Sequence, residues 1–412
     1  MTNILYKKMH QKIIWILLIF ITSVNAQQIK SIQLRPLQAN NFTAIVPLGT
    51  VLELSFDDLD ADSKDYQYKI EHMTHDWQKS RLLSSQFIDG FDQNSIINVT
   101  NSFNTFQNYT HYEVKIPNVN SIITKSGNYL VSILNDDDEV VFSRKLVLYE
   151  NAATIGVAVS RSRNTKTRDT QQTVEFTVNH PNLRINNPSQ EVHVALLKNE
   201  NWNEKITNLQ PTFFQQNQLK YSYANKTNFW GGNEYLNFDS KLIRNKSLNV
   251  VKIDMKNVFH HYLYPSTYKP NRSYTYNPDI NGQFVIRTLD ANDTNTEADY
   301  AMMHFTLYAD TPIANKDVYI YGAFNNFKIE DENKLFYNFE TSSYQGQILL
   351  KQGFYNYTFA TVDDNQLVDT NQINGTFFQT ENQYTVIVYY KPFGGLYDRV
   401  IGIGAGFYNQ NR

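Results

Sequence analysis

The stretch Tyr129–Leu148, YLVSILNDDDEVVFSRKLVL, indicates the fold class of this chain. Apolar residues recur at alternate positions on both sides of four polar residues, 135–138 (NDDD). Successive side chains of a strand point to opposite faces, so this pattern predicts two strands that each bury one face. The polar residues between them favour a turn, and the stretch is therefore predicted to be an antiparallel hairpin.

The same alternation recurs along the chain, whereas the spacing of amphipathic helices is almost absent. Further alternating segments are 51–56, 66–70, 114–116, 155–159, 173–178, 191–196, 248–253, 317–324, 345–350, 354–359 and 384–390. Short strands at such intervals predict an all-β fold of tandem immunoglobulin-like or early-set antiparallel β-sandwiches. We expect domains at residues 27–150, at 151–298 with long loops, and at 299–412.

The composition excludes several kinds of site. The 412 residues include no Cys, so neither a disulfide framework nor a thiolate metal site can form. A net charge of -3 offers no electrostatic attraction for nucleic acid or anionic lipid. The 28 Tyr and 26 Phe provide ample apolar area for the cores of several domains.

The N-terminal residues predict export. Lys7, Lys8 and Lys12 precede an apolar run at residues 13–21, and a small-x-small motif ends at Ala26. These features are typical of a Sec-type signal peptide cleaved after Ala26, and the run is short for a membrane span. We expect a mature periplasmic chain beginning at Gln27, with a retained N-terminal anchor as the alternative.

The strongest metal candidate is the acidic group Asp58, Asp60 and Asp62. Three carboxylates at alternate positions can surround a hard cation such as calcium. The EF-hand pattern fails, however, because Ser63 occupies the position of the required glycine and Lys69 that of the bidentate glutamate. A solvated loop between two strands explains the same acids, so we expect no metal here.

The histidines and the glycine-rich tail do not form recognisable sites either. His72 and His75 resemble half of a zinc site, but the spacing suggests no third ligand, and we interpret them as strand histidines. His260 and His261 have no evident partner ligands, and residues 402–406 (GIGAG) do not open a helix as a dinucleotide loop must. We interpret this tail as turns or a flat, close-packed segment. No Gly-x-Ser-x-Gly motif is present, and we expect neither cofactor nor enzymatic activity.

Residues 318–327 (VYIYGAFNNF) followed by 353–357 (GFYNY) are similar to early-set sandwiches that include glycogen-binding modules. Those modules commonly carry a sugar-stacking Trp where this chain has Phe327, and residues 299–412 contain no Trp. The resemblance therefore implies the fold, with an exported glycan-binding protein as the alternative function.

Several segments together resemble the plug protein family of the Bacteroidota type IX secretion system. They are 66–72 (YQYKIEH), 76–77 (DW), 109–112 (YTHY), 126–129 (SGNY), 232–235 (GNEY), 238–239 (FD), 279–282 (DING), 299–300 (DY) and 392–402 (PFGGLYDRVIG). Leu236 departs from the family, where an Arg is expected after the aromatic residue. The motifs span nearly the whole mature chain in the family's order.

The resemblance implies a non-enzymatic, monomeric periplasmic protein that binds the outer-membrane translocon barrel and seals its periplasmic opening in the resting state. Our candidates for the partner contact are Phe393, Tyr397, Asp398 and Arg399, together with the long middle loops. The alternative for the tail is that Phe393, Tyr397 and Val400 anchor the C-terminus onto a sandwich. A periplasmic hydrolase is a third, less favoured function.

Overall fold

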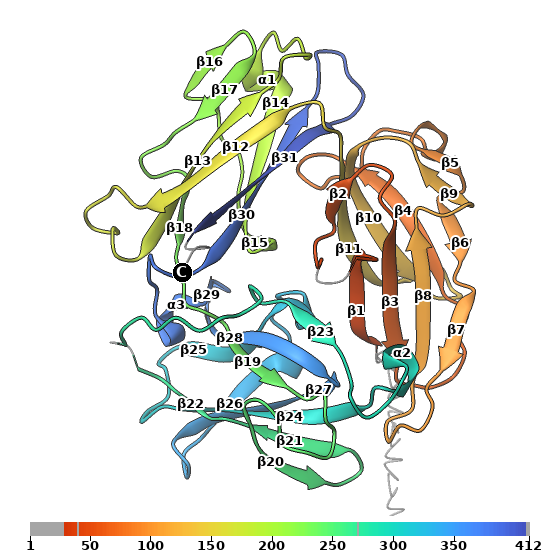
Figure 1. Cartoon of the computed structure of the whole chain (residues 1–412), viewed down its shortest axis with the longest axis vertical. Coiled ribbons are helices and arrows are strands. Elements are labelled where there is room, and N and C mark those ends of the chain that lie inside the picture. The colour runs from red at the N-terminus through yellow and green to blue at the C-terminus, as the bar shows by residue number, and fades with distance from the viewer. Residues whose placement is uncertain (1–28, 39–40, 270–271, 409–412) are drawn as a thin grey trace, which may run out of the picture.

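The computed structural model describes residues 29–38, 41–269 and 272–408, which form three β units around a common centre (Figure 1). Strands make up 49% of the structure and helices 6%, so the all-β prediction is confirmed. The expected signal peptide lies outside the described residues. Among the described ranges, no helix combines the length and the apolar character that a membrane crossing requires.

The first unit is a sandwich of a four-stranded sheet, β1-β3-β8-β7, and a five-stranded sheet, β2-β11-β10-β4-β6, with a small β5-β9 pair. Its elements are β1 (Ile29–Pro36), β2 (Ile45–Pro47), β3 (Leu52–Asp58), β4 (Gln67–Met73), η1 (Ser84–Gln86), β5 (Ile88–Gly90), β6 (Gln93–Ser95), β7 (Asn98–Asn101), β8 (Thr110–Ile116), β9 (Ser121–Ile123), β10 (Gly127–Leu134) and β11 (Val140–Tyr149). The predicted hairpin is confirmed, because β10 and β11 pair antiparallel from Gly127↔Leu148 to Leu134↔Val140.

The second unit packs the sheet β12-β13-β17-β16, with β18 beside β13, against the sheet β15-β14-β30-β31. Its elements are β12 (Thr154–Arg161), β13 (Gln171–Asn179), α1 (Pro188–Glu191), β14 (Val192–Lys198), β15 (Asn201–Ile206), β16 (Phe213–Gln215), β17 (Gln218–Tyr221), β18 (Asn228–Trp230), β30 (Asn382–Tyr390) and β31 (Arg399–Tyr408). The glycine-rich tail is strand β31, which lies flat against β12. A Cβ at Gly404 would be 2.5 Å from Ile155 Cγ2, which explains the run of glycines.

The third unit is one strongly curved sheet of eleven strands with its own apolar core. Its elements are β19 (Leu236–Asp239), β20 (Val250–Met255), β21 (Phe259–Leu263), β22 (Ser266–Thr267), β23 (Phe284–Ile286), α2 (Thr294–Glu297), β24 (Tyr300–Tyr308), β25 (Lys316–Tyr321), η2 (Ala323–Asn325), η3 (Asp331–Asn333), β26 (Lys334–Asn338), β27 (Ser343–Lys351), β28 (Gly353–Asp363), β29 (Val368–Asp369) and α3 (Asn371–Asn374). Its strands come from both of the last two expected domains.

The expected boundary at residue 299 therefore does not coincide with a sheet boundary. Strand β14 pairs with β30, about 190 residues later in the chain, whereas β19 pairs with β28. The third unit is thus inserted between β18 and β30 of the second. The chain leaves and returns at one neck, where the amide of Phe377 donates to the carbonyl of Gly232 at 2.8 Å. Local alternation predicts strands but not their distant partners, which is why the sequence placed this boundary wrongly.

Candidate partner-contact loop and the joints that position it

The loop between β30 and β31, residues 391–398, separates the candidate contact residues into two groups. The side chain of Phe393 is 96% exposed, and its neighbour Leu396, which the sequence analysis did not single out, is 63% exposed. The tip of this loop is therefore the part of the candidate site that is free to contact a partner.

Tyr397, Asp398 and Arg399 instead hold the base of the loop against the first unit. The ring of Tyr397 packs edge-on against the ring of His72, with 5.5 Å between centroids. The buried Asp398 carboxylate accepts a hydrogen bond from the His75 amide at 2.9 Å. Burial raises the pKa of Asp398, but the hydrogen bonds from His75 outweigh this effect and lower it overall.

Arg399 is not paired with its neighbour Asp398. Its guanidinium reaches back to Glu150, at the end of the first unit, with 2.5 Å between Nη2 and Oε2. The adjacent Val400 is fully buried, in agreement with the anchoring alternative for that residue, whereas the side chain of Phe393 is exposed and only its amide is held, by the Glu191 carboxylate at 3.2 Å. Tyr397, Asp398 and Arg399 therefore fix the position of the loop against the first unit.

The interface between the first and second units, here called the first–second joint, is mainly apolar and aromatic. The buried residues at its centre are Ile45, Val147, Ala195, Leu197, Ile387, Tyr389 and Val400. At its rim the rings of His75 and His193 stack with centroids 3.8 Å apart, and Trp77 meets Trp202 edge-on at 4.9 Å. Burial, followed by the neighbouring His75, lowers the pKa of His193.

The interface between the first and third units, the first–third joint, is centred on a buried charge. The fully buried carboxylate of Asp57 lies 2.7 Å from the Lys351 ammonium and accepts a hydrogen bond from the Tyr300 hydroxyl, also at 2.7 Å. His111 Nδ1 lies 2.6 Å from the other carboxylate oxygen. Burial raises the pKa of Asp57, but Lys351 and His111 reverse this effect and lower it overall.

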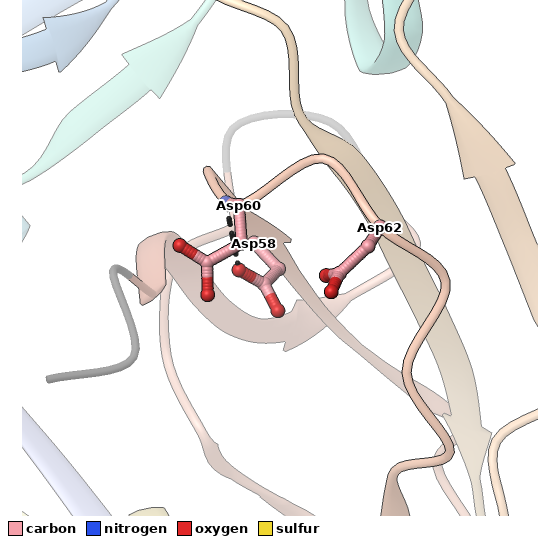
Figure 2. A group of neighbouring side chains, drawn as sticks. All are labelled: Asp58, Asp60 and Asp62. Atoms are coloured by element: carbon pink, nitrogen blue, oxygen red, sulfur yellow. Dashed lines mark hydrogen bonds between the residues drawn. The ribbon is translucent and has the colours of Figure 1, made fainter. Parts of the chain in front are cut away.

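The acidic group Asp58, Asp60 and Asp62 does converge, as Figure 2 shows, and its carboxylate oxygens lie within 4.8 Å of one another. The ammonium of Lys64 lies among them, 2.9 Å from Asp58 Oδ2, 3.4 Å from Asp62 Oδ1 and in contact with Asp60. The hydrogen bonds and charges of these acids raise the pKa of Lys64 despite its partial burial. The site thus carries its own cation, and the arrangement favours the interpretation as a loop.

The histidine pairs do not form a metal site among the described residues. His72 is buried in β4, while His75 faces the second unit, and no third ligand joins them. His260 does have a hydrogen-bond partner that the sequence did not indicate, because its Nδ1 lies 2.7 Å from His304 Nε2 on β24. His261 bonds instead to the carbonyl of Ile243. The sequence missed His304 because parallel pairing of β21 with β24 brings it in from 44 residues away.

The glycan-binding alternative receives no support from the third unit. Phe327, at the position of the sugar-stacking Trp, is only 7% exposed and packs against Tyr321. A buried ring offers no platform for a sugar.

The segments that resemble the plug family gather at the joints and at tight backbone approaches. Tyr109 of the first unit donates to the carbonyl of Ala298 at 2.8 Å, and Asp299 accepts from two amides of the first unit. A Cβ at Gly127, whose φ is +153°, would be 2.4 Å from Nε2 of His72. Lys351 belongs to none of these motifs, and alternation alone gives no sign that its ammonium is buried.

The fold and its joints define a class of protein in which three β units brace one another and present an exposed loop tip. A family described as "Type 9 secretion system plug protein 1st domain" matches residues 29–150. A crystal structure described as a hypothetical protein from Parabacteroides merdae ATCC 43184 has 31% sequence identity and a TM-score of 0.88, covering 92% of this chain and 97% of that one. A search of curated proteins found no match.

The first unit of this chain belongs to the plug protein family of the type IX secretion system. Membership implies an envelope-associated location and contact with a component of that secretion system.

Proposed function

We propose that this protein is a non-enzymatic periplasmic plug that binds the outer-membrane translocon barrel of the type IX secretion system and seals its periplasmic opening while no cargo is exported. The observation that carries the proposal is the family match over the first unit, residues 29–150. A barrel wide enough for folded cargo is a permanent leak unless something covers it. A broad, exported protein without chemistry of its own suits that task.

The way the units are joined supports this role. A seal has to resist deformation, and each unit here is fixed to both others by buried contacts. The second and third units meet where the buried Asn201 donates from Nδ2 to the Tyr321 hydroxyl at 3.3 Å, besides the neck described above. Such bracing lets a protein meet a rigid partner with little loss of conformational entropy.

The exposed loop tip, Phe393 and Leu396, is our proposed contact with the barrel. Buried apolar anchors contribute most of the free energy in protein interfaces, and the surrounding polar contacts contribute little. Tyr397, Asp398 and Arg399 then act by fixing the direction of the tip. A seal with few anchors and a polar rim can still release when cargo arrives.

The first test deletes the gene and leaves the translocon intact. We expect higher outer-membrane permeability to bulky antibiotics and, in the wild-type strain, co-purification of the protein with the translocon. Unchanged permeability together with no co-purification would refute the proposed function.

A second test addresses the loop tip. The double variant F393A/L396A should weaken binding to the translocon by about 2 kcal/mol, roughly 30-fold. The matched control is F339A/L367A, because Phe339 is 78% and Leu367 65% exposed on turns of the third unit. Equal binding by both double variants would rule out the loop tip as the contact while leaving the plug function standing.

A further inference from the structure

A cavity of about 270 Å³ lies at the centre of the molecule, where all three units contribute to its wall. Figure 1 shows β1 and β11 of the first unit, β15 of the second and β23 of the third around this centre. The apolar part of the wall includes Phe42, Trp202, Phe284 and Phe327. The cavity is partly open, so a small molecule or the end of a peptide has a route into it.

Three cations line this cavity, Arg35, Arg144 and Lys145. None has a carboxylate within the salt-bridge distance of 4.0 Å among the described residues, although Glu53 faces Arg35 across the β1–β3 pair and the charge of Glu330 acts on Arg144. Burial lowers the pKa of all three, to about 10 for Arg144 and to about 8 for Lys145. All three side chains are half-buried, and a charge held even partly away from water is costly when it is unpaired.

The contacts that these cations do make leave much of their binding capacity unused. Arg144 Nη1 donates to the carbonyl of Ser143 at 3.0 Å, and its guanidinium lies 5.4 Å from the centre of the Phe142 ring. Lys145 lies over Trp77 at 4.7 Å and over Trp202 at 5.0 Å. A guanidinium has five N–H donors, so Arg144 retains donors for a planar anion.

The only acid among the described residues that line the cavity is Glu200. Burial raises its pKa to about 7, so near neutral pH it supplies only part of one negative charge. The cavity thus has a surplus of positive charge enclosed by aromatic walls. Arg144 also lines a neighbouring cavity of about 560 Å³, whose wall carries Glu139, Glu330 and Glu332 as well as Lys30 and Lys328. The surplus of positive charge is therefore confined to the central cavity, and the neighbouring one gives space for an uncharged part of a longer ligand.

We propose that this central cavity is a binding site for a carboxylate attached to an apolar body, with Arg144 as the principal anion-binding residue. The aromatic wall takes the apolar body, and Arg35 and Lys145 strengthen the attraction. Two sources share this chemistry, a free organic acid and the C-terminal carboxylate of a peptide. The site is separate from the loop tip, and the inference does not depend on the plug function.

The experiment titrates the purified full chain with two probes, 3-phenylpropionate and N-acetyl-phenylalanine, and measures binding by calorimetry and ligand-observed NMR. The corresponding neutral amides are the ligand controls. We expect saturable binding of at least one acid and binding of its amide that is at least about tenfold weaker. Preference for the first probe identifies a free acid as the better ligand, and preference for the second identifies a peptide terminus.

The variant R144M keeps an unbranched apolar side chain and removes the guanidinium. It should bind the acids at least about tenfold more weakly, while R163M, which removes the exposed Arg163 of the second unit, should bind as the wild type does. Because Arg144 has no ion-pair partner, R144M should melt at the same temperature as the wild type or higher. No saturable binding of either acid, equal binding of acids and amides, or unchanged affinity in R144M would each overturn the proposal.

Discussion

The two joints of the first unit solve the same packing problem with opposite chemistry. The first–second joint excludes water with a cluster of aliphatic and aromatic side chains, and its histidines stack at the rim. The first–third joint buries Asp57 and Lys351 in contact with each other, supported by Tyr300 and His111. Apolar burial tolerates small adjustments, whereas a buried ion pair is satisfied in one geometry only. The first–second joint therefore serves mainly to hold two units together, whereas the first–third joint also aligns its two units by fixing their relative position.

The largest expected effect comes from breaking the buried ion pair on one side. K351M should lower the free energy of unfolding of the first–third joint by about 3–5 kcal/mol, because it leaves the Asp57 carboxylate without its cation. Urea unfolding followed by tryptophan fluorescence and hydrogen exchange measures the loss. The double variant D57N/K351M should recover most of it, and K334M, in an exposed pair with Asp317, should cost less than about 1 kcal/mol. A cost for K351M as small as that for K334M would contradict the alignment role.

The next effect concerns the backbone beneath the first–second joint. G127A should lower the free energy of unfolding by about 2 kcal/mol, because φ at Gly127 is +153° and the new Cβ would be 2.4 Å from His72 Nε2. Thermal unfolding of G127A, H72A and the double variant measures the coupling between the two positions. If the clash is the cause, the double variant costs less than the two single costs added together; full additivity would show that the clash does not matter.

Acid should weaken the first–second joint before the first–third joint. Burial lowers the pKa of His72 to about 4, whereas an unfolded histidine titrates near 6.5. The unfolded chain therefore binds protons that the folded chain rejects. The contribution of neutral His72 to the free energy of unfolding is fully present above about pH 6.5 and is lost as the pH falls toward 4. The free energy of unfolding should fall by about 1–2 kcal/mol between pH 7.5 and pH 5.

Urea midpoints measured across that pH range test this expectation. H72F keeps an apolar ring among Phe87, Tyr129 and Tyr397 and removes the titrating group. The pH profile of H72F should accordingly be flatter than that of the wild type. Identical slopes for the two proteins would assign the acid sensitivity to other groups.

The smallest expected effect comes from removing a single methyl group at the first–second joint. I387V at the centre of the first–second joint should cost about 1 kcal/mol, the usual value for a buried Ile shortened to Val. I70V, in the separate core of the first unit, is the matched control, because both isoleucines are fully buried. Hydrogen exchange should show that I387V loosens the joint and that I70V loosens only the first unit. Identical exchange patterns would mean that the joint does not open independently.

The strands were predictable from sequence because alternation is a local property. Residues 129–148 contain their own turn, and the structure forms that hairpin. The insertion of the third unit was not predictable, since nothing in residues 384–390 states that their neighbour is β14. Alternation shows that a segment is a strand with one buried face. It does not show which strand lies beside it, because every strand of a sandwich has the same pattern.

The candidate site was predictable only in part for a related reason. The segment at residues 392–402 was singled out by resemblance, yet alternation cannot distinguish the exposed Phe393 from the half-buried Tyr397. Arg144 and Lys351 occupy strand positions where charged residues usually face water. They are at least partly covered here because another unit packs against the face of the sheet on which they lie. The sequence of a single strand does not indicate such a neighbour.

The insertion of one unit within another gives the last strands of the chain unusual importance. The second sandwich lacks half of one sheet until β30 and β31 are made, and they follow the whole third unit, Leu236–Asn374, in the chain. Deleting residues 382–408 would therefore remove two of the four strands of one sheet of the second unit. In a protein whose domains follow one another without insertion, the same deletion would affect only the last domain. Newly made chains must keep an unfinished sheet edge out of contact with one another until β30 and β31 are in place, and aggregation is the main risk during that interval.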